Sequence, residues 1–170
     1  MRCHGNGRSA AAVAARKERI AGNSVNITNQ KRSTSRRIAL QAIYQAEVQG
    51  DAFIAQMLPT FINQATDDND VRQLATRMAC GAWDYRNDAD QWASRLIPRW
   101  TITRLAAVDR NILRLALWEL THESDTPGKV VVDEAINMAK EYSTEDSSAF
   151  INGVLDAAMR QHNLLTGPAE

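Results

Sequence analysis

The sequence predicts an all-α protein, because apolar residues recur with helical spacing and no segment alternates with the period of a β-strand. The clearest pattern lies between residues 105 and 120. Its apolar positions recur at three- and four-residue steps: Leu105, Val108, Ile112, Leu115, Ala116 and Leu120. Hydrophobic residues make up 44% of the 170 residues, which is enough for one domain with a sizeable core. We expect about seven helices and no sheet.

The first four helices are predicted from caps, turns and short apolar patterns. Ser33 or Thr34 can cap a first helix that ends at Gly50. Asp51 can then cap a short apolar helix, which Pro59 kinks or shortens. A polar turn with helix-start chemistry separates this pair from the next two helices. The four expected ranges are residues 33–48, 53–62, 71–82 and 88–97.

Three amphipathic segments follow, joined by short polar turns, over residues 106–120, 130–142 and 143–159. In each, the apolar residues make one stripe that must be buried. Phe150 falls at the edge of the last stripe, on the same side as Asp146. An aromatic ring at the edge of a stripe can face solvent or a ligand.

Basic charge is concentrated at the N-terminal end. Residues 1–37 contain nine Lys or Arg and one acidic residue, whereas residues 38–170 contain eleven basic and nineteen acidic residues. We expect residues 1–32 to be a disordered basic arm on an acidic body. Such an arm suits nucleic acid, because each cation placed on a phosphate releases counterions. A solubilising tail, a misassigned start and a transit segment are the alternatives for these residues.

No motif in the sequence indicates an enzyme, a metal site or a membrane span. Gly128 and Lys129 lack the glycine spacing of a phosphate-binding loop, and the three histidines and two cysteines lack metal-ligand spacing. No apolar run approaches the roughly 20 residues that cross a bilayer. We therefore expect a non-catalytic cytoplasmic protein without a cofactor.

Four segments carry a recognisable pattern: RRIALQAIY at 36–44, VDRNILR at 108–114, VDEAI at 132–136 and EDSSAFINGVL at 145–155. Together they resemble the NusB family of bacterial transcription antitermination proteins, over roughly residues 33–160. The resemblance implies two packed helical bundles, which we place at residues 33–165. It also implies binding of single-stranded boxA RNA together with ribosomal protein NusE, within the antitermination complex of RNA polymerase. Ala149 departs from the family pattern, because a basic residue often stands there.

The first helix offers a polar ridge that suits RNA. Arg37, Gln41 and Tyr44 stand at i, i+4 and i+7, away from the apolar stripe. A cation, an amide and a phenol suit the phosphate, the base edge and the base face of a single strand. On spacing alone, Tyr44 could instead pack with Leu40 and Val48 on the second helix.

The resemblance extends this set of RNA-facing positions. It implies that these positions are Arg36, Gln41 and Tyr44 in the first helix and Tyr142, Asp146 and Phe150 near the C-terminal end. Asp146 is also a favourable residue for a helix N-terminus. Its carboxylate repels phosphates but can accept hydrogen bonds from base amino groups, so it would favour selectivity over affinity.

Acidic and aromatic residues between positions 68 and 97 make a candidate face for a basic ribosomal protein. The residues are Trp83, Asp84, Tyr85, Asp88, Asp90 and Trp92, of which Asp84, Tyr85 and Asp88 are the predicted contacts. Several of these aromatics could instead be core. Two other functions stay open: the RNA-binding domain of a ribosomal-RNA cytosine methyltransferase, which shares this fold, and a protein-only scaffold. Only ten residues follow Arg160, so we expect no catalytic domain.

Overall fold

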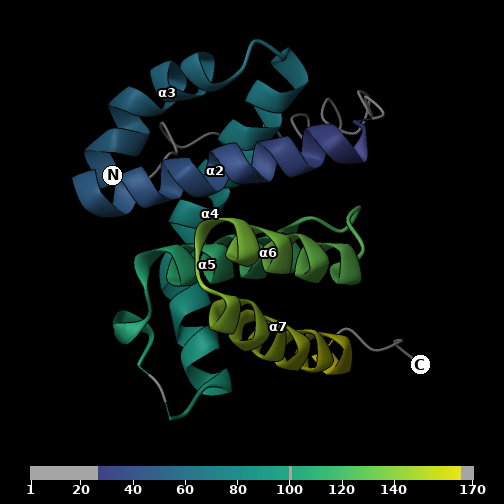
Figure 1. Cartoon of the computed structure of the whole chain (residues 1–170). Coiled ribbons are helices and arrows are strands. Elements are labelled where there is room, and N and C mark those ends of the chain that lie inside the picture. The colour runs from purple at the N-terminus through teal and green to yellow at the C-terminus, as the bar shows by residue number, and fades with distance from the viewer. Residues whose placement is uncertain (1–26, 100, 166–170) are drawn as a thin grey trace, which may run out of the picture.

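The computed structural model describes residues 27–99 and 101–165, and these residues form helices without a strand. The helices are α2 (Asn29–Gln49), α3 (Leu58–Ala65), α4 (Asn69–Leu96), α5 (Ala107–His122), α6 (Gly128–Tyr142) and α7 (Glu145–Leu165), with a π-helical turn η1 (Phe53–Met57) and a 3-10 turn η2 (Ile102–Arg104) (Figure 1). The all-α prediction is confirmed. Most of the predicted arm, residues 1–26, lies outside the described residues.

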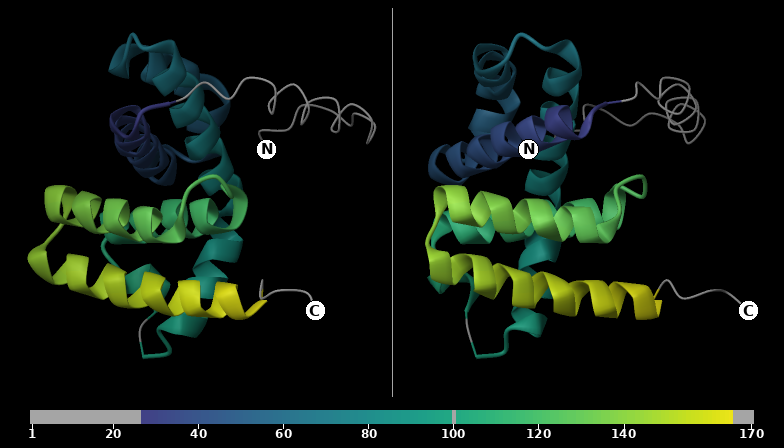
Figure 2. Two further views of the ribbon diagram at one scale, coloured as in Figure 1. Left: turned by 90° about the vertical axis from the view of Figure 1, so that its right-hand side faces the viewer. Right: turned by 45° about the vertical axis from the view of Figure 1, so that its right-hand side comes forward.

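The helices pack as two bundles that share α4. The first half of α4 packs with α2 and α3, and its second half packs with α5 and α7 (Figures 1 and 2). α6 completes the second bundle by packing on α5 and α7. A single long helix therefore joins the two bundles, and the two-bundle arrangement is confirmed.

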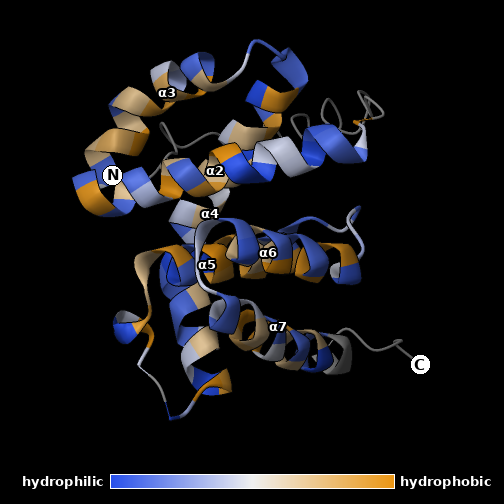
Figure 3. Cartoon of the chain, viewed as in Figure 1, coloured by the Kyte–Doolittle hydropathy of each residue, from blue (hydrophilic) through white to orange (hydrophobic). Residues whose placement is uncertain are grey.

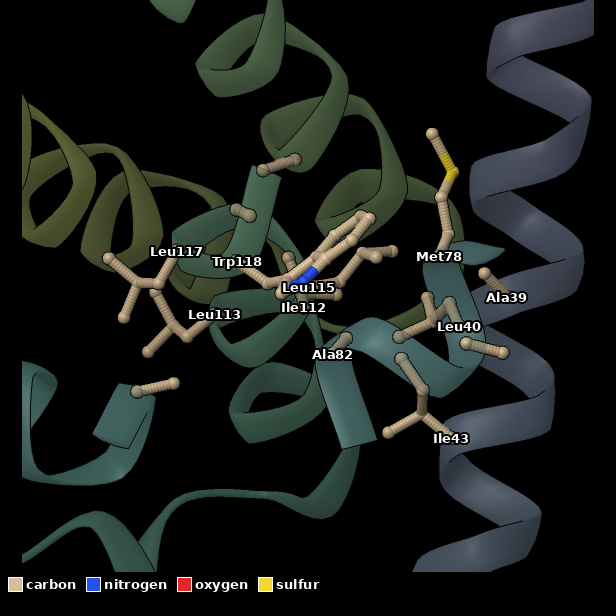
Figure 4. Packing of buried hydrophobic residues seen from close by; sticks show 14 of the residues in the cluster. Ala39, Leu40, Ile43, Met78, Ala82, Ile112, Leu113, Leu115, Leu117 and Trp118 are labelled. Carbon is tan, nitrogen blue, oxygen red and sulfur yellow. The ribbon is translucent and has the colours of Figure 1, made fainter. Parts of the chain in front are cut away.

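The core is continuous across both bundles. Alanine and branched aliphatic side chains fill it, and Figure 4 shows part of it, with side chains of α2, α4 and α5. In most of the helices the apolar side is buried and the polar side is exposed (Figure 3), whereas α5 is buried on nearly all sides. None of the described helices is long and apolar enough to cross a membrane.

α4 corrects the predicted helix count. The sequence predicts two helices, over residues 71–82 and 88–97, but the structure has one helix of 28 residues. The charged residues near the expected break do not interrupt the helix, because Asp84 and Asp88 face solvent while Ala82 and Ala89 stay buried. Six helices are therefore present in the described part of the chain, where seven were expected over the whole sequence.

Gly81 lies in the interior of α4 because of the indole of Trp118. A Cβ atom added at Gly81 would stand 2.3 Å from Cε2 and Cζ2 of the Trp118 ring. No side chain can fit there without moving the ring, which is 6% exposed. Gly81 leaves room for the indole of Trp118, and α4 continues past it.

We expect Gly81→Ala to destabilise the fold, although alanine is normally the better helix former. Overpacking of a filled core costs about 1 to 3 kcal/mol. Gly153→Ala is the matched control, because its Cβ would meet nothing within 4 Å on α7, and it should be neutral or stabilising. Urea unfolding of both variants measures the difference, and equal stability would contradict the close packing on Trp118.

α2 begins earlier than predicted. Thr28 caps it by accepting from the backbone N–H of Lys31 at 3.3 Å. The Lys31 ammonium contacts Asp68 at 2.9 Å and Asp70 at 2.7 Å, and Arg32 donates to Thr126. Residues 27–32, which the sequence assigned to the arm, therefore belong to the helical body.

The second predicted helix divides at Pro59. Residues 53–57 form the π-helical turn η1, and α3 starts at Leu58. Proline has no backbone N–H and is tolerated in the first turn of a helix, where that donor would be unpaired. The expected shortening at Pro59 is not seen, because α3 continues past the predicted end at residue 62 to Ala65.

Candidate nucleic-acid interface

The two regions of the chain that carry the predicted RNA-facing residues lie on one side of the molecule. α2 and α6 both run towards the left in Figure 1, and α7 begins there and runs back. The C-terminal half of α2, the end of α6 and the start of α7 therefore share one edge. Side chains also link α2 to α6 before this edge, as Ser33 donates to Glu134 at 2.8 Å.

A hollow of about 260 Å³ opens between α2 and α6. It is lined by Leu40, Gln41, Tyr44, Gln45, Val108 and Tyr142. Tyr44 is 39% exposed and Gln41 is exposed, so the alternative in which Tyr44 is core does not hold. The structure thus brings together three of the predicted residues: Gln41, Tyr44 and Tyr142. We call this hollow the groove.

Three lining residues were not predicted. Gln45 lies one helical turn after Gln41, a spacing that could have revealed it. Leu40 and Val108 are the apolar lining residues. Val108 belongs to the stripe of residues 105–120, and the sequence offered Leu40 only as a packing partner of Tyr44. An apolar residue at the edge of the core can line a groove, and the sequence alone does not distinguish such a residue from one that is fully buried.

Arg37 stands beside the groove in an ion pair with Glu141 of α6. Its Nε atom donates to Oε2 of Glu141 at 2.7 Å. This bond raises the pKa of the Arg37 guanidinium and lowers the pKa of the Glu141 carboxyl. Burial, and then the neighbouring Glu141, raise the pKa of the Tyr142 phenol, so the phenol stays protonated and can donate a hydrogen bond. Glu141 was not predicted.

Arg36 does not face RNA, and this prediction is wrong. Its side chain is 1% exposed. Nε and Nη2 donate to both carboxylate oxygens of Glu119 at 2.8 to 3.2 Å, and Nη1 lies 3.9 Å from Glu134. Arg36 precedes the buried Ala39 and Ile43 by three and seven positions, which places it on the core face of α2. This spacing in the sequence could have shown that Arg36 is buried.

We expect Arg36→Met to lower the free energy of unfolding by about 3 to 5 kcal/mol, because it leaves the Glu119 carboxylate buried without its cation. Arg37→Met is the matched control on the next residue. Its pair with Glu141 is exposed, so the loss should stay below about 1 kcal/mol. Chemical denaturation of both variants tests this contrast, and similar losses would contradict it.

Asp146 and Phe150 lie in the first two turns of α7. Asp146 is exposed, while Phe150 is half-buried and packs against the core. The start of α7 is fixed to α5, because Ser147 Oγ donates to Asp109 Oδ2 at 2.8 Å. The backbone N–H of Ser147 also donates to Thr144. Phe150 thus presents only part of its ring at this edge.

A sequence profile of the NusB family matches residues 33–160. The chain belongs to the NusB family. It is 39% identical to the transcription antitermination protein NusB of Symbiobacterium thermophilum over 136 residues, 76% of this chain and 89% of the relative. The corresponding protein of Myxococcus xanthus is 37% identical, over 74% of this chain and 91% of the relative.

Solved structures of this family share the fold. The T. maritima NusB structure is 36% identical, with a TM-score of 0.65 over 74% of this chain and 88% of that chain. NusB in a crystal structure of the antitermination factors NusB and NusE with double-stranded RNA is 23% identical, with a TM-score of 0.68 over 76% of this chain and 96% of that chain.

The VDRNILR segment of this NusB family member is structural. Arg110 and Asn111 both donate to Glu47 of α2, which fixes the end of α2 on α5. Arg114 donates to both carboxylate oxygens of Asp90 in α4 at 2.7 and 2.8 Å. The VDRNILR segment therefore holds the groove in place and contributes only Val108 to its lining.

The predicted protein face on α4 is smaller than the sequence indicated. Asp84 and Asp88 are exposed, and Tyr85 is half-buried with its ring edge-on to His122 at 5.0 Å between centroids. Burial raises the pKa of Tyr85. Trp83, which the sequence grouped with this face, is 7% exposed, and its N–H donates to Asp51. Asp90 pairs with Arg114, and the Trp92 N–H donates to Gln161.

Proposed function

We propose that this protein is a non-catalytic transcription antitermination factor that binds boxA-like single-stranded RNA together with ribosomal protein NusE. It would act in the cytoplasm, within the antitermination complex of RNA polymerase, and so support transcription of ribosomal RNA. The observation that carries the proposal is the groove. In a chain of the NusB family, it combines Gln41, Tyr44 and Tyr142 from two helices on one exposed edge.

The chemistry of the groove suits unpaired bases. Exposed aromatic rings can stack on base faces, and Gln41 can donate to and accept from base edges. In double-stranded RNA these base faces are already stacked. Arg37 would supply phosphate contact, and Asp146 would accept from base amino groups while disfavouring phosphates. Phe150 would add a further aromatic surface where α7 begins.

NusE is proposed as the protein partner because this fold occurs in a solved NusB–NusE complex with RNA. We propose that Asp84, Tyr85 and Asp88 contribute to the partner surface. Two exposed carboxylates beside a half-buried phenol complement a basic protein, and such charge complementarity mainly sets specificity and association rate.

We expect the purified protein with NusE to bind a boxA-like single strand more tightly than a scrambled strand or the same sequence in a duplex. Fluorescence anisotropy with and without NusE measures these affinities at a stated salt concentration. Equal affinity for the boxA-like and scrambled strands in the presence of NusE would overturn the proposed function. A preference for the duplex would overturn the role of base stacking.

Tyr44→Ala and Phe150→Ala should each weaken binding of the boxA-like strand by about 1 to 3 kcal/mol, the range for one stacked base. Val48→Ala is the control for Tyr44, since Val48 lies one turn further along α2 and is 69% exposed. It should leave the affinity unchanged. If Tyr44→Ala binds like the control, Tyr44 does not stack on RNA. Thermal unfolding of each variant separates lost contact from lost fold.

A further inference from the structure

We propose that Glu141 competes with RNA for Arg37: its carboxylate occupies the guanidinium in the free protein, and an RNA phosphate replaces it in the complex. The inference rests on the proposed RNA binding and adds a residue that limits affinity at the groove. Glu141 was not among the residues predicted to face RNA.

The first argument is the position of the pair. Arg37 on α2 and Glu141 on α6 bridge the two helices that form the groove, with Nε and Oε2 2.7 Å apart. Glu141 directly precedes Tyr142, which lines the groove. Arg37 lies one helical turn before Gln41, which also lines the groove. The pair is therefore next to the groove, and the proposal places a phosphate of the bound strand at it.

The second argument is that the pair can exchange partners. The Arg37 side chain is 35% exposed and that of Glu141 is 44% exposed. An exposed ion pair contributes little to stability, since water and salt already compete for both charges. A guanidinium also presents its five N–H donors in a fork that matches the oxygens of a phosphate. Replacing the carboxylate by a phosphate therefore costs the protein little free energy of folding.

The neighbouring arginine shows what a pair that cannot exchange looks like. Arg36 and Glu119 are each 2% exposed as side chains, and two guanidinium nitrogens engage the carboxylate. No phosphate can reach this pair without unfolding the interface between α2 and α5. Two consecutive arginines thus meet glutamates in opposite ways, one as a fixed structural pair and one as an accessible pair.

The competition has a measurable consequence. Glu141 places a negative charge where the phosphate must arrive, so each RNA that contacts Arg37 must displace or tolerate it. Removing that charge should raise the affinity for RNA. This increase in affinity should become smaller as the salt concentration rises, because salt screens the charges at the site. The gain should also require Arg37, because the carboxylate acts by occupying that guanidinium.

The test compares Glu141→Gln with the wild-type protein, using the boxA-like and scrambled strands in the presence of NusE. We expect affinity at low salt to rise by about two- to fivefold, the equivalent of one exposed ion pair. Asp133→Asn is the matched control. It makes the same charge change at an exposed site on α6, roughly 12 Å away along the helix axis. This control should change affinity less, because the interaction between charges weakens with distance. At 0.1 M salt the separation also exceeds the Debye length of about 10 Å.

A double-variant comparison isolates the role of Arg37. In an Arg37→Gln background, Glu141→Gln should give no more gain than Asp133→Asn. A full gain in that background would overturn the inference, because Glu141 would then act on RNA without Arg37. An unchanged or lower affinity for Glu141→Gln, with the wild-type preference for the boxA-like strand intact, would also overturn it and leave the proposed function standing. Absence of preference in the wild-type protein would instead overturn the proposed function itself.

Discussion

The buried pair between Arg36 and Glu119 is the constraint on which the arrangement of the two bundles depends. It joins α2 of the first bundle to α5 of the second, with Glu134 of α6 close to the same guanidinium. A buried charge is tolerated only when it is paired and hydrogen-bonded, so α2 can meet α5 in very few ways. The groove is a consequence, because it forms where α2 passes the end of α6.

Two further contacts fix the remaining freedom of the helices. The indole of Trp118 packs against the backbone of α4 at Gly81, which brings α4 and α5 together. Glu47, near the end of α2, is held by Arg110 and Asn111 of α5. Since both contacts converge on α5, this helix acts as the common support for the groove. That role explains why nine consecutive residues of α5, 111–119, are buried.

Side chains that support the groove and side chains that can meet a ligand alternate closely along the chain. Arg36 is structural and Arg37 is accessible, and Ser147 anchors the start of α7 while Asp146 is exposed beside it. Consecutive residues on a helix point about 100° apart, so adjacent positions routinely have different roles. A motif match spanning several residues therefore assigns a family more securely than it assigns contacts.

The sequence by itself determined the helical class, the last three helices, the family and three groove residues, Gln41, Tyr44 and Tyr142. These follow from local period, turn chemistry and motif order, which depend on neighbours within a few positions. Only the tertiary structure decided that α4 is continuous, that Arg36 is buried and that Glu141 faces Arg37. The first depends on the burial of Ala82 and Ala89 in the core. The other two depend on residues of another helix, Glu119 against Arg36 and Glu141 against Arg37. A local pattern cannot specify which distant side chain completes a contact, because helix packing sets that choice.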